Sequence, residues 1–199
     1  MTTSLFIALS IFAAIAAYTP GPNNTLLLSS GVNHGLRASL PMIAGVGIGF
    51  PFLIICVGLG LGKAFAAYPI ILTAIKVAGT IYMLWLAFKI ATEKPSSGSA
   101  IDAAKPLNFW QACAFQWVNP KAWIMGGYAL SAFTLPEYFY TGIGAVTGVF
   151  MFMGFTSAAT WALFGVGLQK LMQDQRWFRI INISLAILLV ASLAPMLWH

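Results

Sequence analysis

The chain has 199 residues, of which 60% are hydrophobic and only 7% are charged. Soluble domains carry about 25% charged residues, so this chain has too few to cover a water-facing surface. Its formal net charge is +6, but the ten basic residues are scattered along the sequence and form no basic patch. The composition therefore predicts a membrane protein embedded in a lipid bilayer, and it excludes a nucleic-acid partner.

Long apolar blocks in chain order predict an all-α membrane protein with six transmembrane helices. A spanning helix needs about 20 apolar residues, and blocks of this kind cover residues 4–30, 39–62, 67–91, 108–134, 139–168 and 176–198. No Lys or Arg precedes the first block, as one would in a secretory signal, so we expect it to be a true first helix. The polar stretch 93–107 is expected to be a cytoplasmic connector. It divides a single transmembrane domain, residues 1–199, into three-helix halves at 1–92 and 108–199.

The basic residues are distributed unequally between the two sides that these spans define. Seven lie in or beside the connections after the first, third and fifth spans, namely Arg37, Lys89, Lys94, Lys105, Lys170, Arg176 and Arg179. The opposite side has only Lys63, and Lys76 and Lys121 fall within spans. The positive-inside rule places the three connections in the cytoplasm and both termini in the periplasm. We therefore expect a multi-pass protein of a bacterial inner membrane.

The two halves carry signs of an inverted repeat. Helix-breaking clusters begin at Pro20 and Asn119, 99 positions apart, and Gly45-xxx-Gly49 and Gly144-xxx-Gly148 have the same offset. Two halves of three spans each must be inverted relative to one another, which is a recurring plan of secondary transporters. We expect all four glycines to serve close helix packing, either within the chain or against a second copy, so a homodimer is one alternative.

The first break is the run Thr19-Pro20-Gly21-Pro22-Asn23-Asn24 within an otherwise apolar span. Two prolines remove backbone donors, so a straight helix cannot pass through. Such a backbone is tolerated at membrane depth only where protein or a water-filled cavity satisfies it. Pro22 suits the first turn of a restarted helix, whose free N–H groups attract an anion such as an amino-acid carboxylate. The two asparagines could bind that carboxylate or the ammonium.

The second break lies midway in the fourth span, in the run Gln116-Trp117-Val118-Asn119-Pro120-Lys121. Lys121 is a charge at membrane depth, which is costly and marks a functional candidate. Its side chain could instead hold the loosened backbone together, and Asn23 and Asn119 could simply cap broken helices. We expect the two breaks to face each other across a central cavity and to bind a substrate there, using Thr19 to Asn24, Gln116 and Asn119 to Lys121.

Carboxylates are missing from the depth of the predicted spans, because Glu93, Asp102, Glu137 and Asp174 all fall in loops or at span ends. A cationic substrate would lack a counter-charge, so a neutral zwitterion fits better. Cys56 and Cys113 are not spaced as a CxxC pair, and the two histidines are isolated, so we expect no metal or cofactor. An intramembrane enzyme would need a nucleophile and base that the spans do not offer. A thiol-relay protein that uses both cysteines is a further alternative.

Four motifs occur together: TPGPNN at 19–24, HGLR at 34–37, AGVGIG at 44–49 and QWVNPK at 116–121. In this combination, over nearly its whole length, the chain resembles the LysE/RhtB family of bacterial amino-acid exporters. The runs WLAFKIAT at 85–92, KPLNFWQACAFQWVN at 105–119 and ALSAFTLP at 129–136 are most similar to the cysteine/O-acetylserine exporter branch. Basic amino-acid exporters of the family have an NPxxxxD pattern after this break, and Met125 stands here instead.

The resemblance implies efflux from the cytoplasm, generally driven by the proton-motive force, and not an enzyme. Together with the two inverted halves, it leads us to expect a secondary exporter that works by alternating access. Its implied substrates are small neutral amino acids or derivatives such as cysteine and O-acetylserine. Another neutral amino acid, such as homoserine, threonine or leucine, is the alternative within the family.

Overall fold

All secondary structure in the described part of the chain is helical, which confirms the predicted all-α class. The computed structural model describes residues 1–61, 67, 69–92, 106–171 and 174–191. Its elements are α1 (Thr3–Tyr18), α2 (Pro22–Cys56), the π-helix η1 (Val57–Leu61), α4 (Pro69–Ala91), α5 (Phe109–Val118), α6 (Pro120–Phe133), the 3-10 helix η2 (Pro136–Tyr138), α7 (Phe139–Leu168) and α8 (Gln175–Ala191).

The helix ends follow from the local sequence. α2 and α6 each begin with a proline at the first helical position, where the missing N–H costs nothing. α5 begins with a capping box in which the Asn108 side chain accepts from the Gln111 backbone and the Gln111 side chain accepts in return. The helices predicted to be interrupted at 19–24 and 116–121 are therefore interrupted there, between α1 and α2 and between α5 and α6.

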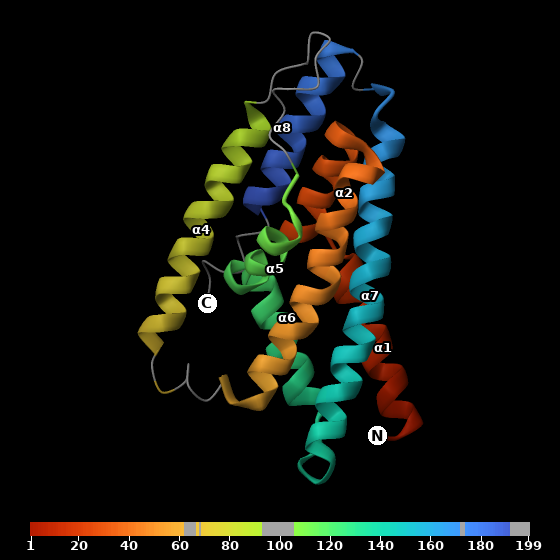
Figure 1. Cartoon of the computed structure of the whole chain (residues 1–199), viewed down its shortest axis with the longest axis vertical. Helices are drawn as coiled ribbons and strands as arrows, with labels where there is room; N and C mark the ends of the chain where they lie inside the picture. Colours follow the sequence, from red (N-terminus) through yellow and green to blue (C-terminus); the bar gives the residue numbers. More distant parts are fainter. Residues whose placement is uncertain (62–66, 68, 93–105, 172–173, 192–199) are drawn as a thin grey trace.

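α2 contains two helices that meet at a turn. Gly35 has φ 79°, a left-handed conformation that glycine adopts without a side-chain penalty. The chain reverses there, and Figure 1 shows the second part of α2 running back beside the first. The reversal separates the first predicted span from the second, but the connection is much shorter than the predicted gap of 31–38.

Two helical stretches in the described chain are long and apolar enough to cross a bilayer, namely Pro22–Gly60, which includes the turn at Gly35, and Pro136–Leu168. Shorter apolar helices cover Thr3–Tyr18 and Thr80–Ala91. The breaks explain why helices such as α1, α5 and α6 are individually shorter than a membrane span.

The helices pack around α2 and α7, which share the largest contact; α4 and α8 lie side by side at one flank (Figure 1). The buried apolar residues form two clusters. The first joins α2 to α5, α4 and α8 through residues such as Leu27, Phe115 and Leu189. The second joins α1, the later part of α2, α6 and α7 through residues such as Leu9 and Phe150. The helix breaks lie where one cluster gives way to the other.

Glycines allow the closest helix contacts. Of the four glycines expected to do so, only two take part in such contacts within the chain. A Cβ added at Gly45 would lie 2.5 Å from Phe109 O, and one at Gly49 would lie 2.7 Å from Cys113 Cα, so both glycines seat α5 against α2. The packing role predicted for Gly144 and Gly148 is wrong within the chain. Both are exposed on α7 and have no atom within 4 Å of an added Cβ.

α7 instead approaches α2 through Gly165, where an added Cβ would lie 2.3 Å from Leu28 O. The glycine pairs 99 positions apart therefore do not occupy equivalent packing positions. Their spacing in the sequence carries no information about which face of α7 meets a neighbour.

Several predictions fall on residues outside the described part of the chain. They are most of the connector at 93–107, the end of the sixth predicted span after residue 191, and the loop positions of Lys63, Lys94 and Lys105.

Candidate functional site

The first break exposes the carboxyl end of α1, and side chains satisfy its carbonyl groups. Asn24 Nδ2 donates to Ala17 O and to Thr19 O, both at 2.8 Å. Ser157 Oγ on α7 donates to Ala17 O, also at 2.8 Å. Because Asn24 and Ser157 are buried, these bonds fix the end of α1 against α2 and α7.

The restarted helix begins with an amino end that no side chain caps. Gly21 is the N-cap of α2 and Pro22 the first helical residue, and the first intrahelical bond runs from Thr25 N to Gly21 O. The N–H groups of Asn23 and Asn24 have no partner within the helix by its geometry. This amino end also carries about half a positive charge from the helix dipole.

The second break is closed by its own asparagine. Asn119 ends α5 and caps α6, and its Oδ1 accepts from Lys121 N at 3.1 Å. The Asn119 carbonyl accepts from Ala122 N at 3.1 Å. The side chain is 2% exposed, so the capping role that the sequence left as an alternative is present at Asn119. The amino ends of α2 and α6 therefore differ, since only the second is capped.

Two sets of hydrogen bonds join the breaks across about half of the sequence. Asn23 Nδ2 donates to Gln116 Oε1 at 2.8 Å, and Gln116 Nε2 donates back to Asn23 Oδ1 at 3.1 Å. Lys121 Nζ donates to Thr19 O at 2.7 Å, to Thr19 Oγ1 at 2.9 Å and to Pro20 O at 3.3 Å. The structure thus places the two predicted clusters face to face.

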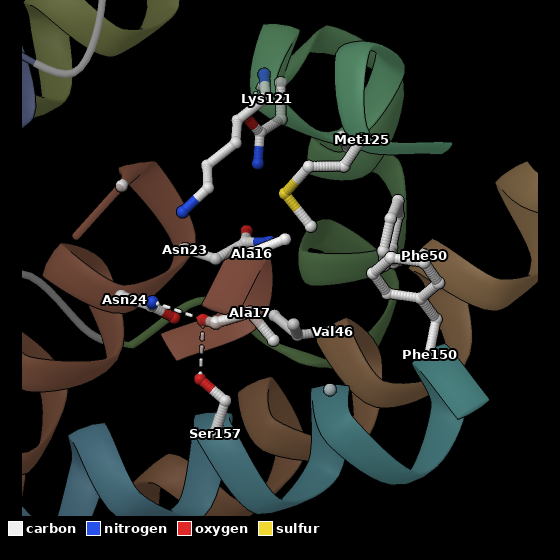
Figure 2. Close-up of a pocket in the computed structure, with 14 residues that line it drawn as sticks. Ala16, Ala17, Asn23, Asn24, Val46, Phe50, Lys121, Met125, Phe150 and Ser157 are labelled. Atoms are coloured by element: carbon white, nitrogen blue, oxygen red, sulfur yellow. Dashed lines mark hydrogen bonds between the residues drawn. The ribbon is translucent and has the colours of Figure 1, made fainter. Parts of the chain in front are cut away.

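A cavity lies between the breaks (Figure 2). It encloses about 450 Å³ of space free of protein atoms, part of it open to the surroundings. Its lining is Ala16, Ala17, Gly21, Asn23, Asn24, Val46, Phe50, Asn119, Lys121, Ala122, Met125, Phe150, Gly154 and Ser157. These described residues come from α1, α2, α6 and α7, and Lys121 is the one formally charged side chain among them.

Half of the predicted site residues line this cavity, namely Gly21, Asn23, Asn24, Asn119 and Lys121. Thr19, Pro20 and Gln116 act behind them as hydrogen-bond partners, and Pro22 and Pro120 begin the restarted helices. Sequence reasoning missed the α7 residue Ser157 and an apolar wall that includes Phe50 and Phe150. The sequence held no signal that singles out Ser157, because the same span also contains Thr141, Thr147, Thr156 and Thr160.

The aromatic rings of Phe50 and Phe150 meet edge to face with centroids 5.3 Å apart. The cavity therefore places one apolar wall opposite a group of donors and acceptors at the breaks. This arrangement suits a small molecule that has charged groups at one end and a short uncharged side chain at the other.

The cysteines lie elsewhere. Cys56 ends α2, and the thiol of Cys113 on α5 donates to Gly45 O at 3.4 Å. Both thiols are free, and neither residue lines the cavity. Among the described residues there is no group of three His, Cys, Asp or Glu side chains that could hold a metal ion.

Interrupted helices that meet at a cavity within an apolar bundle are a recurring feature of secondary transporters. The LysE type translocator family matches residues 14–194, so the chain belongs to the LysE type translocators; it is a transporter and not an enzyme. It is 38% identical, over 192 residues and 96% of each chain, to the cysteine/O-acetylserine efflux protein of Escherichia coli (strain K12). The protein of the same name from Shigella sonnei (strain Ss046) has the same identity and coverage. No solved structure matches the chain.

Proposed function

We propose that this LysE-type amino-acid exporter carries small neutral amino acids or their derivatives, such as cysteine and O-acetylserine, out of the cytoplasm. The observation that supports this most strongly is the uncapped amino end of α2 at a cavity whose described lining contains no carboxylate. The names of the similar proteins, cysteine/O-acetylserine efflux proteins, support the substrate choice.

The substrate carboxylate binds at the amino end of α2. Asn23 and Asn24 would donate their backbone N–H groups to it, and the helix dipole favours a negative charge there. The corresponding end of α6 is a poorer anion site, because Asn119 Oδ1 already accepts from the Lys121 backbone N–H. The difference between the two caps therefore favours α2 over α6 as the anion site.

The cavity wall selects an uncharged side chain. Val46, Phe50, Met125 and Phe150 offer only apolar contacts, and no described lining residue could neutralise a second positive charge. Burying an unpaired charge is costly, so lysine and arginine are poor substrates. Threonine, homoserine and leucine remain candidates by charge, and their size relative to the wall decides between them and cysteine.

Transport proceeds by alternating access between two inverted three-helix repeats in a six-span domain, residues 1–92 and 108–199, joined by the connector 93–107. The support is that each half contains a span interrupted before a proline, and that the two interrupted spans meet. The apolar clusters on either side of the breaks are suited to seal the cavity from opposite membrane faces in turn. The proton-motive force drives export.

The orientation follows from charge. The chain lies in a bacterial inner membrane with both termini in the periplasm, and the connections after the first, third and fifth spans lie in the cytoplasm. Of the basic residues that support this orientation, Arg37, Lys89, Lys170, Arg176 and Arg179 lie within the described part of the chain.

Efflux from proteoliposomes tests the function. Vesicles are loaded with a mixture of neutral and basic amino acids and O-acetylserine, and the released solutes are identified by mass with and without a pH gradient. Selective release of cysteine or O-acetylserine, increased by the gradient, supports the proposal. Release of homoserine, threonine or leucine instead would replace the substrate, and release of lysine or arginine would contradict the charge argument. Asn119→Ala and Pro22→Ala should both insert in the membrane but lose efflux, and normal efflux in either would remove this site.

A further inference from the structure

The ammonium group of Lys121 sits in a complete cation site. Its three N–H donors have three acceptors: Thr19 O at 2.7 Å, Thr19 Oγ1 at 2.9 Å and Pro20 O at 3.3 Å. The two carbonyl groups follow the carboxyl end of α1, which carries about half a negative charge from the helix dipole. No protein carboxylate takes part, so backbone and hydroxyl oxygens alone hold the cation.

The neighbouring residue leaves room for the lysine side chain to reach this site. A Cβ added at Gly21 would lie 2.7 Å from Lys121 Cδ and 3.0 Å from Lys121 Nζ. The absence of a side chain at Gly21 therefore lets the lysine stem lie against the backbone between α1 and α2. The cation site is also only two residues along the chain from Pro22, where the proposed anion site at the start of α2 begins.

Building on the proposed function, we propose that Thr19 O, Thr19 Oγ1 and Pro20 O form the binding site for the α-ammonium group of the substrate, and that Lys121 occupies this site when the transporter is empty. An amino acid carries the same primary ammonium group as a lysine side chain. Its carboxylate is one carbon away from that ammonium, which matches an anion site and a cation site at adjacent ends of α2 and α1.

The substrate ammonium and the Lys121 ammonium compete, because one set of three acceptors satisfies only one of them. Around Lys121, the described cavity lining from α1, α2, α6 and α7 supplies asparagine, serine and apolar side chains and no other titratable group. A displaced lysine has no counter-charge there, and an unpaired charge at membrane depth is costly. Lys121 therefore releases its proton when the substrate binds.

The exchange balances. Protonated Lys121 and a zwitterion give neutral Lys121, a bound zwitterion and one proton in solution, so the total charge is unchanged. Release of the substrate at the opposite face returns the cation site to Lys121, which takes up a proton there. One zwitterion is exported for each proton imported, and the exchange requires no carboxylate relay within the membrane.

Proton release on binding tests this exchange. L-cysteine is added to the purified full-length protein in nanodiscs in weakly buffered solution containing a pH indicator, and binding is measured in parallel. The wild type should release about one proton per bound cysteine, and its affinity should fall up to about tenfold for each unit of pH lowered. Lys121→Met should bind cysteine without releasing a proton and with little dependence on pH. Lys170→Met, which removes an exposed lysine beyond α7, should behave as the wild type.

Lys121→Arg separates this inference from a structural role. Arginine keeps the positive charge but does not deprotonate in proteins, so it should block the site and weaken cysteine binding at least about tenfold. If Lys121 only ties the two breaks together, the reverse is expected: Lys121→Arg keeps cysteine binding and Lys121→Met loses it.

The outcomes separate the two proposals. That reverse pattern, or cysteine binding to the wild type without proton release, would overturn the inference and leave the exporter function intact. A folded wild type that binds no neutral amino acid would overturn both. If Lys121→Met does not fold, Lys121→Arg and the proton count of the wild type still decide.

Discussion

Replacing Gly165 by alanine should destabilise the protein through the contact between α2 and α7. The added methyl group would lie 2.3 Å from Leu28 O and 2.8 Å from Val32 N, and both are backbone atoms that no rotamer change can move. Gly31 presents the same situation from the other helix, because its added Cβ would lie 2.1 Å from Ala162 O. Either substitution therefore forces the two helices apart.

The expected cost follows from these distances. Non-bonded atoms are most favourably separated by about 3.5–4.0 Å, so the helices must separate by roughly 1 Å or more. Overpacking of this kind costs about 1–3 kcal/mol, from which about 0.5–1 kcal/mol is regained because alanine is the better helix former. The matched control is Gly148→Ala on the same helix, which meets no atom within 4 Å and should show only the gain.

Reversible unfolding in mixed detergent micelles, followed by circular dichroism, measures these differences. Gly165→Ala should be less stable than Gly148→Ala by about 1–3 kcal/mol, which is the overpacking term alone. Equal stability of the two variants would refute the close approach of α2 and α7 at this position.

Three further predictions test the site. Asn23→Ala and Gln116→Ala should show a coupling energy of about 1–2 kcal/mol in a double-mutant unfolding cycle, because two interhelical hydrogen bonds join these amides. A coupling energy near zero would mean that the bonds do not form in a membrane. Asn119→Ala should lose about 0.5–2 kcal/mol of unfolding free energy, because it removes the side-chain cap that accepts from the Lys121 N–H. Asn119→Ser should recover most of this free energy, and equal losses in the two variants would argue against capping. Phe150→Ala should cost about 3–5 kcal/mol of unfolding free energy and enlarge the cavity at its apolar wall, so leucine efflux should rise relative to cysteine efflux. An unchanged ratio would exclude this wall from substrate selection.

The interruptions could be predicted from the sequence because proline acts locally. Pro20, Pro22 and Pro120 lack a donor and clash with the preceding turn. Proline alone does not suffice, because Pro41 and Pro51 lie inside α2; the breaks occur where proline stands beside a glycine or an asparagine. The meeting of the two breaks was predicted from their equivalent positions in the two halves. The structure brings them together through the Asn23–Gln116 pair.

The partners of Lys121 could not be read from its position in a span. A lysine at membrane depth indicates that a counter-charge or hydrogen-bond acceptors are present. Backbone oxygens cannot be predicted as those acceptors from the sequence, because every residue has one. Thr19 O and Pro20 O act as acceptors only because α1 ends there and α6 packs close by. Packing within the chain was wrongly predicted for Gly144 and Gly148 for a related reason, since spacing alone does not say which face of a helix meets a neighbour, and an added Cβ at either glycine meets no atom within 4 Å.

The distance between a bound substrate and the start of α2 tests the central claim most directly. The protein is labelled with ¹⁵N at asparagine backbone amides, reconstituted in lipid and loaded with [1-¹³C]cysteine for a solid-state dipolar recoupling measurement. Of the six asparagines in the sequence, Asn23, Asn24 and Asn119 line the cavity. A carboxylate hydrogen-bonded to the amides of Asn23 and Asn24 places the labelled carbon within about 4 Å of their nitrogens. We expect strong dephasing that persists in Asn119→Ser. Bound cysteine with no dephasing, or with dephasing lost in Asn119→Ser, would contradict carboxylate binding at this helix end.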